Sequence, residues 1–169
     1  MSIERLFLLD PYNDKQVSMI KEFEHDNNLS NEISNNIGQI RSSISKETYL
    51  ETKKEKNEIQ DNLFLEKGLK ITDCCLIQGE KDIKTCRINF YPLKNKILKR
   101  KLALYAANYA INSLGMEEVF LNIDPNDKSM ISYLDSNGFE NLGLENNKLL
   151  YLKENIEEKE IQRKISWKY

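Results

Sequence analysis

Residues Glu117 to Phe139 read EEVFLNIDPNDKSMISYLDSNGF and contain the strongest indication of the fold class. Val119 to Ile123 is a largely apolar run, typical of a buried strand, and Asp124-Pro125-Asn126 breaks it. The next residues predict a helix of about two to three turns, and Asn137-Gly138-Phe139 opens another strand. Polar groups at a strand end and at a helix start then lie side by side, a common place for a ligand in α/β proteins.

The composition indicates one soluble globular domain over residues 1–169. The chain has 40% hydrophobic and 31% charged residues and a net charge of −2, so we expect no bulk attraction to nucleic acid or to an anionic membrane. Its apolar runs are far shorter than the roughly 20 residues that a membrane helix needs. The start of the chain, MSIERLF, lacks the apolar core of a secretory signal. We therefore expect a cytoplasmic protein.

The cysteine and histidine content argues against metal or thiol chemistry. The cysteines are Cys74, Cys75 and Cys86, and an odd count with two adjacent members is a poor disulfide framework. His25 is the single histidine. We expect reduced, partly buried thiols and no metal site.

The first half of the chain predicts a strand followed by helices. Arg5 to Leu9 has a strand pattern, and Asn13 or Asp14 can cap a helix that runs to about Asp26. A narrow apolar stripe then predicts one amphipathic helix within residues 27–60; its members are Ile33, Ile37, Ile40 and Ile44. From residue 45 to residue 60 the stripe fades, which indicates a solvated helix end or a loop.

The second half predicts an antiparallel meander that begins at Asn62, then a helix from Ile97 to Leu114 with Gly115 at its C-terminal cap. Strands after Phe139 close the domain. Residues 160–169 alternate in polarity and predict one extra C-terminal strand, with a helix as the alternative. The apolar face of this strand, which includes Trp167 and Tyr169, could dock on a partner or form a homodimer.

This order of elements resembles the GCN5-related N-acetyltransferase family over nearly the whole chain. The resemblance implies a mixed α/β (α+β) fold, with a mostly antiparallel sheet and about four flanking helices. It also implies that the strands Ile83–Tyr91 and Val119–Ile123 separate, so that the acyl-pantetheine arm of acetyl-CoA lies in the wedge between them. Acetyl-CoA is the co-substrate that the resemblance implies.

The family holds the pyrophosphate of CoA on backbone N–H groups at a helix N-terminus, where glycines allow a close approach. The matching window here is Lys94 to Lys99, with Ile97 and Lys99 at the glycine positions. In one reading, the basic side chains bind phosphates that the backbone still holds; in the other, the run is a solvated helix end. The full set of residues that the resemblance implies for acetyl-CoA is Phe90, Tyr91, Lys94, Asn95, Lys96, Ile97, Leu98, Lys99, Arg100, Asn126 and Ser129.

The family places a proton-donating tyrosine on the helix after the wedge. Counting forward from Asn126 through Ser129 assigns this role to Tyr133, whereas counting back from Gly138 puts Leu134 at that position. One residue turns a helical side chain by about 100°, so a regular helix satisfies only one of the two counts. We choose Tyr133.

The resemblance implies acetyl transfer from acetyl-CoA to a primary amine by direct attack. A backbone N–H near Tyr91 would polarise the thioester, and Tyr133 would protonate the sulfur. The candidate general bases are Glu66, Glu47 and Glu51. The acceptor, a small molecule or a protein amine, would enter beside the two N-terminal helices and the closing strands. The alternative is a catalytically degenerate member that keeps the fold as a binding or assembly module.

Overall fold

The structure is a computed structural model that describes residues 4–91 and 96–155. These residues form seven strands and five helices. The elements are β1 (Glu4–Leu8), α1 (Asp14–Asp26), α2 (Glu32–Ser43), α3 (Lys46–Glu55), β2 (Glu58–Lys67), β3 (Lys70–Glu80), β4 (Thr85–Phe90), α4 (Lys96–Asn112), β5 (Glu118–Ile123), α5 (Lys128–Ser136), β6 (Glu140–Glu145) and β7 (Lys148–Glu154). The C-terminal strand predicted at residues 160–169 lies outside the described residues.

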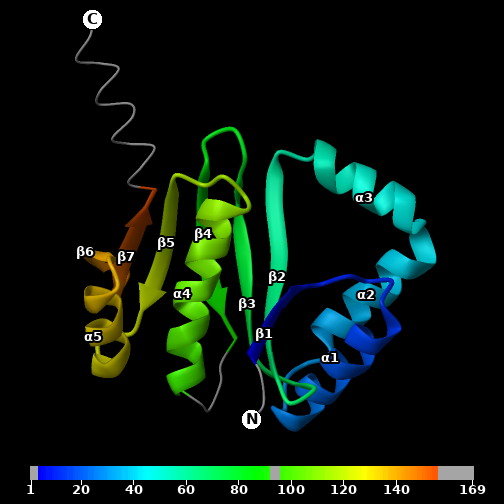
Figure 1. Ribbon diagram of the computed structural model, residues 1–169, viewed down its shortest axis with the longest axis horizontal. Helices are drawn as coiled ribbons and strands as arrows, with labels where there is room; N and C mark the ends of the chain where they lie inside the picture. The colour runs from blue at the N-terminus through cyan, green and yellow to red at the C-terminus, as the bar shows by residue number, and fades with distance from the viewer. Residues whose placement is uncertain (1–3, 92–95, 156–169) are drawn as a thin grey trace, which may run out of the picture.

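The seven strands form a single sheet in the order β1-β2-β3-β4-β5-β7-β6. Each neighbouring pair is antiparallel except β4 and β5, which run parallel. Figure 1 shows the strands side by side, with α4 across the middle, α5 near β6 and β7, and α1 to α3 towards the β1 end. The mixed, mostly antiparallel sheet predicted from the sequence is confirmed.

The two faces of the sheet bury two separate apolar clusters, because successive side chains of a strand point to opposite faces. Leu63 and Ile77 belong to the cluster that packs against α4 and α5, where Leu102 and Leu134 are fully buried. Phe64 and its neighbours belong to the cluster under α1 and α2. Helices thus cover each face, and the sheet between them carries the site.

Helix α4 lies close to the sheet because its inner face is made of small side chains. Ala103, Ala106, Ala107 and Ala110 are completely buried. Helix α4 is followed by a capping turn at Gly115, whose φ of +72° allows the N–H of Met116 to donate to the carbonyl of Ala110 at 3.0 Å. The predicted C-terminal cap at Gly115 is confirmed.

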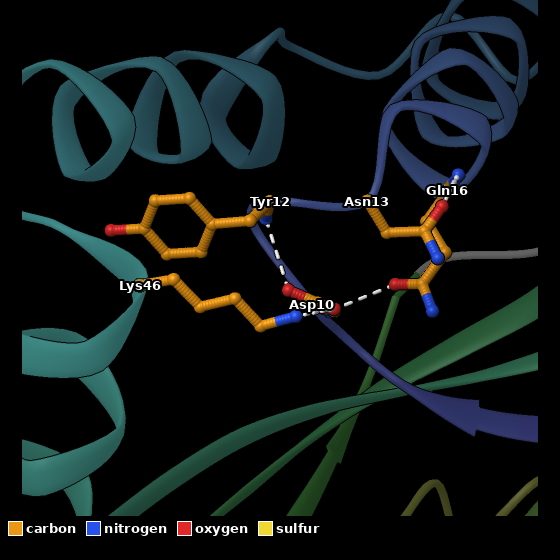
Figure 2. A network of polar contacts seen from close by, with 5 residues as sticks. All are labelled: Asp10, Tyr12, Asn13, Gln16 and Lys46. Carbon is orange, nitrogen blue, oxygen red and sulfur yellow. Dashed lines mark hydrogen bonds and ion pairs between the residues drawn. The ribbon is translucent and has the colours of Figure 1, made fainter.

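A polar network at Asp10 fixes the start of α1 and ties α3 to the β1–α1 turn (Figure 2). The Asp10 carboxylate accepts from the N–H of Tyr12 at 3.0 Å and pairs with Nζ of Lys46 at 3.7 Å. The N–H of Asp10 donates to Oε1 of Gln16 at 2.8 Å, and the side chain of Asn13 caps the helix by accepting from the N–H of Gln16. Asn13 is therefore the N-cap, one of the two candidates predicted from the sequence.

The structure differs from the prediction between residues 45 and 61. A separate helix, α3, begins after Ser45, whose hydroxyl caps it, and β2 begins at Glu58 instead of Asn62. None of the residues of α3 is buried, so no apolar stripe marks it. The start of β2 is hidden because Asp61, only 4% exposed, takes an inward position that an apolar residue normally fills, and pairs there with Lys53 of α3 at 2.5 Å.

Within the part of the chain that the structure describes, no helix combines the length and the apolar character needed to cross a membrane. The thiols of Cys74, Cys75 and Cys86 are all free and buried. Burial raises the pKa of the Cys86 thiol to about 12, so it keeps its proton at neutral pH. The thiols are therefore part of the core, as expected.

Substitution by alanine should destabilise the protein at Gly79, where β3 and β4 are in close contact, and stabilise it at Gly38 in α2. A Cβ atom at Gly79 would collide with the carbonyl oxygen of Thr85 and lie 2.6 Å from Cβ of Cys86, whereas one at Gly38 in α2 meets open space. Gly79→Ala should lower the free energy of unfolding by about 1–3 kcal/mol. Gly38→Ala should raise it by about 0.5–1 kcal/mol, because alanine is the better helix former. Urea unfolding of both variants checks this, and similar changes in the two would contradict the described register of β3 and β4.

Candidate functional site

The site begins where β4 and β5 part. Their parallel pairing covers four residues of each strand and ends at Ile88 and Leu121. β4 nevertheless continues to Phe90 and β5 to Ile123. Residues 89–90 and 122–123 thus extend beyond the last pair, and the space between them is called the wedge below. The strands that the resemblance predicts to separate are the two that do so.

The backbone N–H that faces the wedge is that of Phe90. The N–H of Tyr91 donates to the carbonyl of Cys74 on β3 at 3.3 Å. Because N–H groups alternate between the two sides of a strand, the N–H of Phe90 is directed towards β5. The N–H expected near Tyr91 is therefore assigned to Phe90.

The side chains of Phe90 and Tyr91 point to opposite faces of the sheet. Phe90 packs against the cluster under α4, where Nζ of Lys99 lies 5.4 Å from its ring centroid. Tyr91 packs against the cluster under α1 and α2. Burial, followed by nearby acidic groups that include Glu32, raises the pKa of Tyr91 to about 12. The end of β4 thus places one side chain on each face of the sheet.

Helix α4 begins beside the wedge, directly after the segment that follows β4. Lys94 and Asn95 of the predicted window lie outside the described residues, and of Lys96, Ile97 and Leu98 the structure describes only that they form the first turn of α4. The first N–H groups of a helix have no partner within it and carry partial positive charge. This end of α4 is therefore suited to an anion.

Two neighbouring cations of α4 differ in whether their charge is already paired. Nζ of Lys101 bonds Oε1 of Glu4 at 2.9 Å. The guanidinium of Arg100 lies 5.8 Å from the ring centroid of Tyr133, and its buried Nε has no hydrogen-bond partner among the described residues. A buried donor without a partner is uncommon in a native protein and calls for an explanation, of which a bound anion is one. Arg100 is thus the better candidate for a phosphate contact.

The structure distinguishes between the two counts along α5. Leu134 is completely buried in the core, whereas Tyr133 is half-buried at the contact with α4, next to Arg100. Partial burial and the nearby Tyr105 raise the pKa of Tyr133, so its hydroxyl keeps its proton at neutral pH. Tyr133 rather than Leu134 can act as a proton donor.

The start of α5 places the other two predicted residues at the surface. Asn126 and Ser129 are both exposed. Asp127 lies between them and caps the helix by accepting from the N–H of Met130 at 3.1 Å. Asn126 and Ser129 remain accessible to a ligand, while Asp127 has a structural role.

The carboxylates considered as bases do not lie at the wedge. Glu47 and Glu51 are exposed on α3, whose C-terminal end is held by Lys81 of the β3–β4 turn, the opposite end of the sheet from the wedge. Glu66 lies on β2, which β3 separates from β4. No described position supports these three as the general base.

Sequence reasoning missed a buried carboxylate at the start of β3. Asp73 is completely buried; its Oδ1 accepts from the N–H of Cys74 at 2.7 Å, and its Oδ2 has no partner among the described residues. Burial raises the pKa of Asp73 to about 7, against smaller opposing effects of the Cys74 bond and of Lys99. A single Asp before an apolar run, TDCCLI, is the only sequence signal, and it is weak.

Sequence reasoning also missed a pocket of about 660 Å³ between α2 and strands β2 and β3, with Tyr91 in its wall. A buried carboxylate on α1 holds α2 in place over it. Glu24 accepts from the N–H of Ile33 at 3.3 Å and from the N–H and hydroxyl of Ser34. The side chain of Asn31 does not cap α2, so Glu24 of another helix supplies this cap.

The buried Asp73 predicts a specific dependence of stability on pH. Its pKa rises from 3.8 to about 7 on folding, so its favourable contribution is complete below about pH 4 and is lost as the pH rises through 7. Asp73→Asn cannot titrate, so between pH 4 and pH 8 its free energy of unfolding should gain on the order of 3 kcal/mol relative to the unmodified protein. Chemical denaturation at a series of pH values checks this. Asp26→Asn is the control, because water already solvates this exposed carboxylate. A difference between Asp73→Asn and the unmodified protein that stays constant with pH would contradict the assignment.

No protein-family model matches this sequence, and no curated protein matches it. Solved structures do match it. The chain is similar to the ribosomal-protein-S5-alanine acetyltransferase of Vibrio fischeri at 10% identity and a TM-score of 0.63, over 92% of this chain and 97% of the other.

Two further structures extend this likeness. The N-acetyltransferase PseH of Campylobacter jejuni, in complex with acetyl coenzyme A, matches at 11% identity and a TM-score of 0.56, over 90% of this chain and 99% of the other. A dodecameric spermidine N-acetyltransferase of Vibrio cholerae matches at 13% identity and a TM-score of 0.54, over 88% and 91%. Such low identities bear on the fold alone. The chain has the fold of the GCN5-related N-acetyltransferases.

Proposed function

We propose that this protein transfers an acetyl group from acetyl-CoA to a primary amine by direct attack in the wedge between β4 and β5. The observation that carries the proposal is the end of the β4–β5 pairing at Ile88 and Leu121, beside the N-terminus of α4. An acyl chain can enter only where two neighbouring strands are not bonded to each other. The phosphates of the same molecule need N–H donors and positive charge. The N-terminus of α4, which begins a few residues after β4 ends, offers both.

The described residues fit the phosphate end of this ligand. The unpartnered Nε of Arg100 is a charged donor available to an anion. Lys99 stands where the family has a glycine, but its side chain extends to the ring of Phe90 and close enough to Asp73 to affect its pKa. Because that direction is towards the sheet, the side chain leaves the helix end free. The replacement of one motif glycine by Lys99 is thus compatible with binding.

The chain's own groups supply three functions at the reacting carbonyl. The N–H of Phe90 would donate to the carbonyl oxygen as negative charge builds up there. The amine nitrogen would form a bond to the carbonyl carbon while the carbon–sulfur bond breaks, and the hydroxyl of Tyr133 would give its proton to the departing thiolate. The amine would lose its proton to a water molecule in contact with bulk solvent, because the carboxylates considered as bases do not lie at the wedge. Acetyl-CoA supplies the activated acyl group.

Two of the similar structures contain the corresponding ligand. PseH of Campylobacter jejuni was solved with acetyl coenzyme A, and PaiA of Thermoplasma acidophilum with coenzyme A. These findings concern those proteins, and they support the same ligand for this chain. The similar structures do not favour the alternative, a binding or assembly module with this fold.

Binding of acetyl-CoA should stabilise the protein measurably. At about 100 times its dissociation constant the ligand adds about 2.7 kcal/mol to the free energy of unfolding. Arg100→Gln should weaken binding about tenfold and so remove about 1.4 kcal/mol of this gain at the same ligand concentration. Lys101→Gln removes the same charge one residue away, but from a cation already paired with Glu4, and should keep the gain. Thermal unfolding with and without acetyl-CoA measures both, and no change at millimolar acetyl-CoA in the unmodified protein would sink the proposal.

The proton donor is tested by Tyr133→Phe. This change should lower kcat at least 100-fold, the lower end of the usual contribution of acid–base catalysis, and leave the stabilisation by acetyl-CoA intact. Tyr109→Phe, on a later turn of α4, is the matched control and should keep kcat within twofold. The release of free thiol in the presence of a panel of primary amines measures the rate. Thiol release with no amine acetylated, or equal rates for the two variants, would argue against the role of Tyr133.

A further inference from the structure

The pocket under α2 is placed to receive the second substrate. It lies on the face of the sheet opposite α4, and Tyr91 in its wall directly follows Phe90, whose N–H faces the wedge. Leu76, which lines it on β3, pairs with Asn89 of β4 at the start of the wedge. A molecule in this pocket therefore lies on the side of the sheet opposite α4, next to the strand end that borders the wedge.

The wall of the pocket is dominated by neutral amide side chains. Six of the described residues that line it carry an amide, namely Asn31, Asn35, Asn36, Gln39, Gln60 and Asn62. Each amide offers both donors and an acceptor. A hydroxyl group likewise both donates and accepts, so a wall of this kind suits a ligand with several hydroxyl groups.

One of these amides is unsatisfied. Oδ1 of Asn62 is buried and has no hydrogen-bond partner among the described residues. Buried polar atoms in native proteins nearly always have a partner, and each exception calls for an explanation such as a missing ligand. A hydroxyl or amine hydrogen of a bound substrate would supply the missing donor. The unpaired Oδ1 of Asn62 supports a ligand at this place independently of the shape of the pocket.

The charge of the wall restricts the class of substrate. Among the described lining residues Glu32 is the one carboxylate, and none is lysine or arginine. A polyamine would need several carboxylates, and an acidic substrate would need a cation. A single carboxylate matches a substrate with one ammonium group. The volume of about 660 Å³ lies in the range of small-molecule sites, which favours a small molecule over a protein chain.

We infer that the acceptor is a neutral, hydroxyl-rich molecule with one primary amine, an amino sugar being the simplest example, bound in the pocket between α2 and strands β2 and β3. Asn62 would accept a hydrogen from it, the other amides would bind its hydroxyls, and Glu32 would attract its ammonium group. Tyr91 and Leu76 would provide the apolar surface for its ring carbons. That the bound molecule is an acetyl acceptor rests on the proposed function, but its binding to the pocket can be tested without acetyl-CoA.

The test compares three amines of different chemistry: the methyl glycoside of glucosamine, spermidine, and a peptide with a free N-terminal alanine. With acetyl-CoA present, kcat/KM for the glycoside should exceed the values for the other two at least tenfold. Without acetyl-CoA, ligand-observed NMR should detect binding of the glycoside to the protein. Preference for spermidine or the peptide would overturn the inference.

Two pairs of variants locate the binding. Asn62→Leu should raise the Kd and the KM for the glycoside at least tenfold and leave stability equal or higher, because it removes a buried acceptor that has no partner. Asn112→Leu, an exposed change at the end of α4, should alter neither constant. Glu32→Gln should also raise the KM for the glycoside, whereas Glu55→Gln on the exposed α3 should not.

The outcomes separate this inference from the proposed function. Glycoside binding that Asn62→Leu abolishes, in a protein that acetyl-CoA does not stabilise, would support the pocket and overturn acetyl transfer. Stabilisation by acetyl-CoA together with absent glycoside binding would do the reverse. Asn62→Leu with an unchanged Kd would overturn the pocket assignment in either case.

Discussion

The short parallel pairing of β4 and β5 determines where helix α4 lies and where the wedge opens. Two parallel neighbours cannot be joined by a tight turn, so the chain must cross over the sheet, and α4 is that crossover. Its four buried alanines let it lie close to the strands. Because the crossover starts where β4 ends, the N-terminus of α4 necessarily lies beside the wedge.

The second face of the sheet depends on a different kind of interaction. Glu24 of α1, fully buried, accepts hydrogen bonds from the first turn of α2. A carboxylate at a helix N-terminus satisfies free N–H groups and complements the helix dipole. This contact fixes the position of α2 over β2 and β3, and with it the wall of the pocket. The wedge is therefore positioned by the β4–β5 pairing, and the pocket by the hydrogen bonds of Glu24 to α2.

The alternation of side chains along β4 connects these two regions. Phe90 faces α4 with its Lys99 and Arg100, and Tyr91 faces the amide-lined pocket. The backbone between them carries the N–H that is directed into the wedge. In the proposed reaction each substrate thus approaches from its own face of the sheet. They meet where β4 and β5 are no longer paired.

Sequence patterns predicted most of the fold because apolar periodicity and turn residues are local signals. The strand-break-helix order around Asp124-Pro125-Asn126, the cap at Gly115 and the meander all agree with the structure. The patterns missed α3 and the start of β2, because a helix that buries nothing and a strand with Asp61 inside carry no apolar signal. They missed Asp73 and Asn62 for the same reason. A polar residue in a strand looks exposed until the neighbouring elements are in place.

From the sequence alone came the order of most strands and helices, the poor disulfide framework and the choice of Tyr133 over Leu134 as the candidate proton donor. The tertiary structure added the packing of α5 on α4, which buries Leu134 and leaves Tyr133 beside Arg100. It alone brought the amides of α2 and β2 into one pocket, and it paired Lys101 while leaving Nε of Arg100 without a partner. Burial and pairing depend on residues far apart in the chain, and local periodicity does not record them.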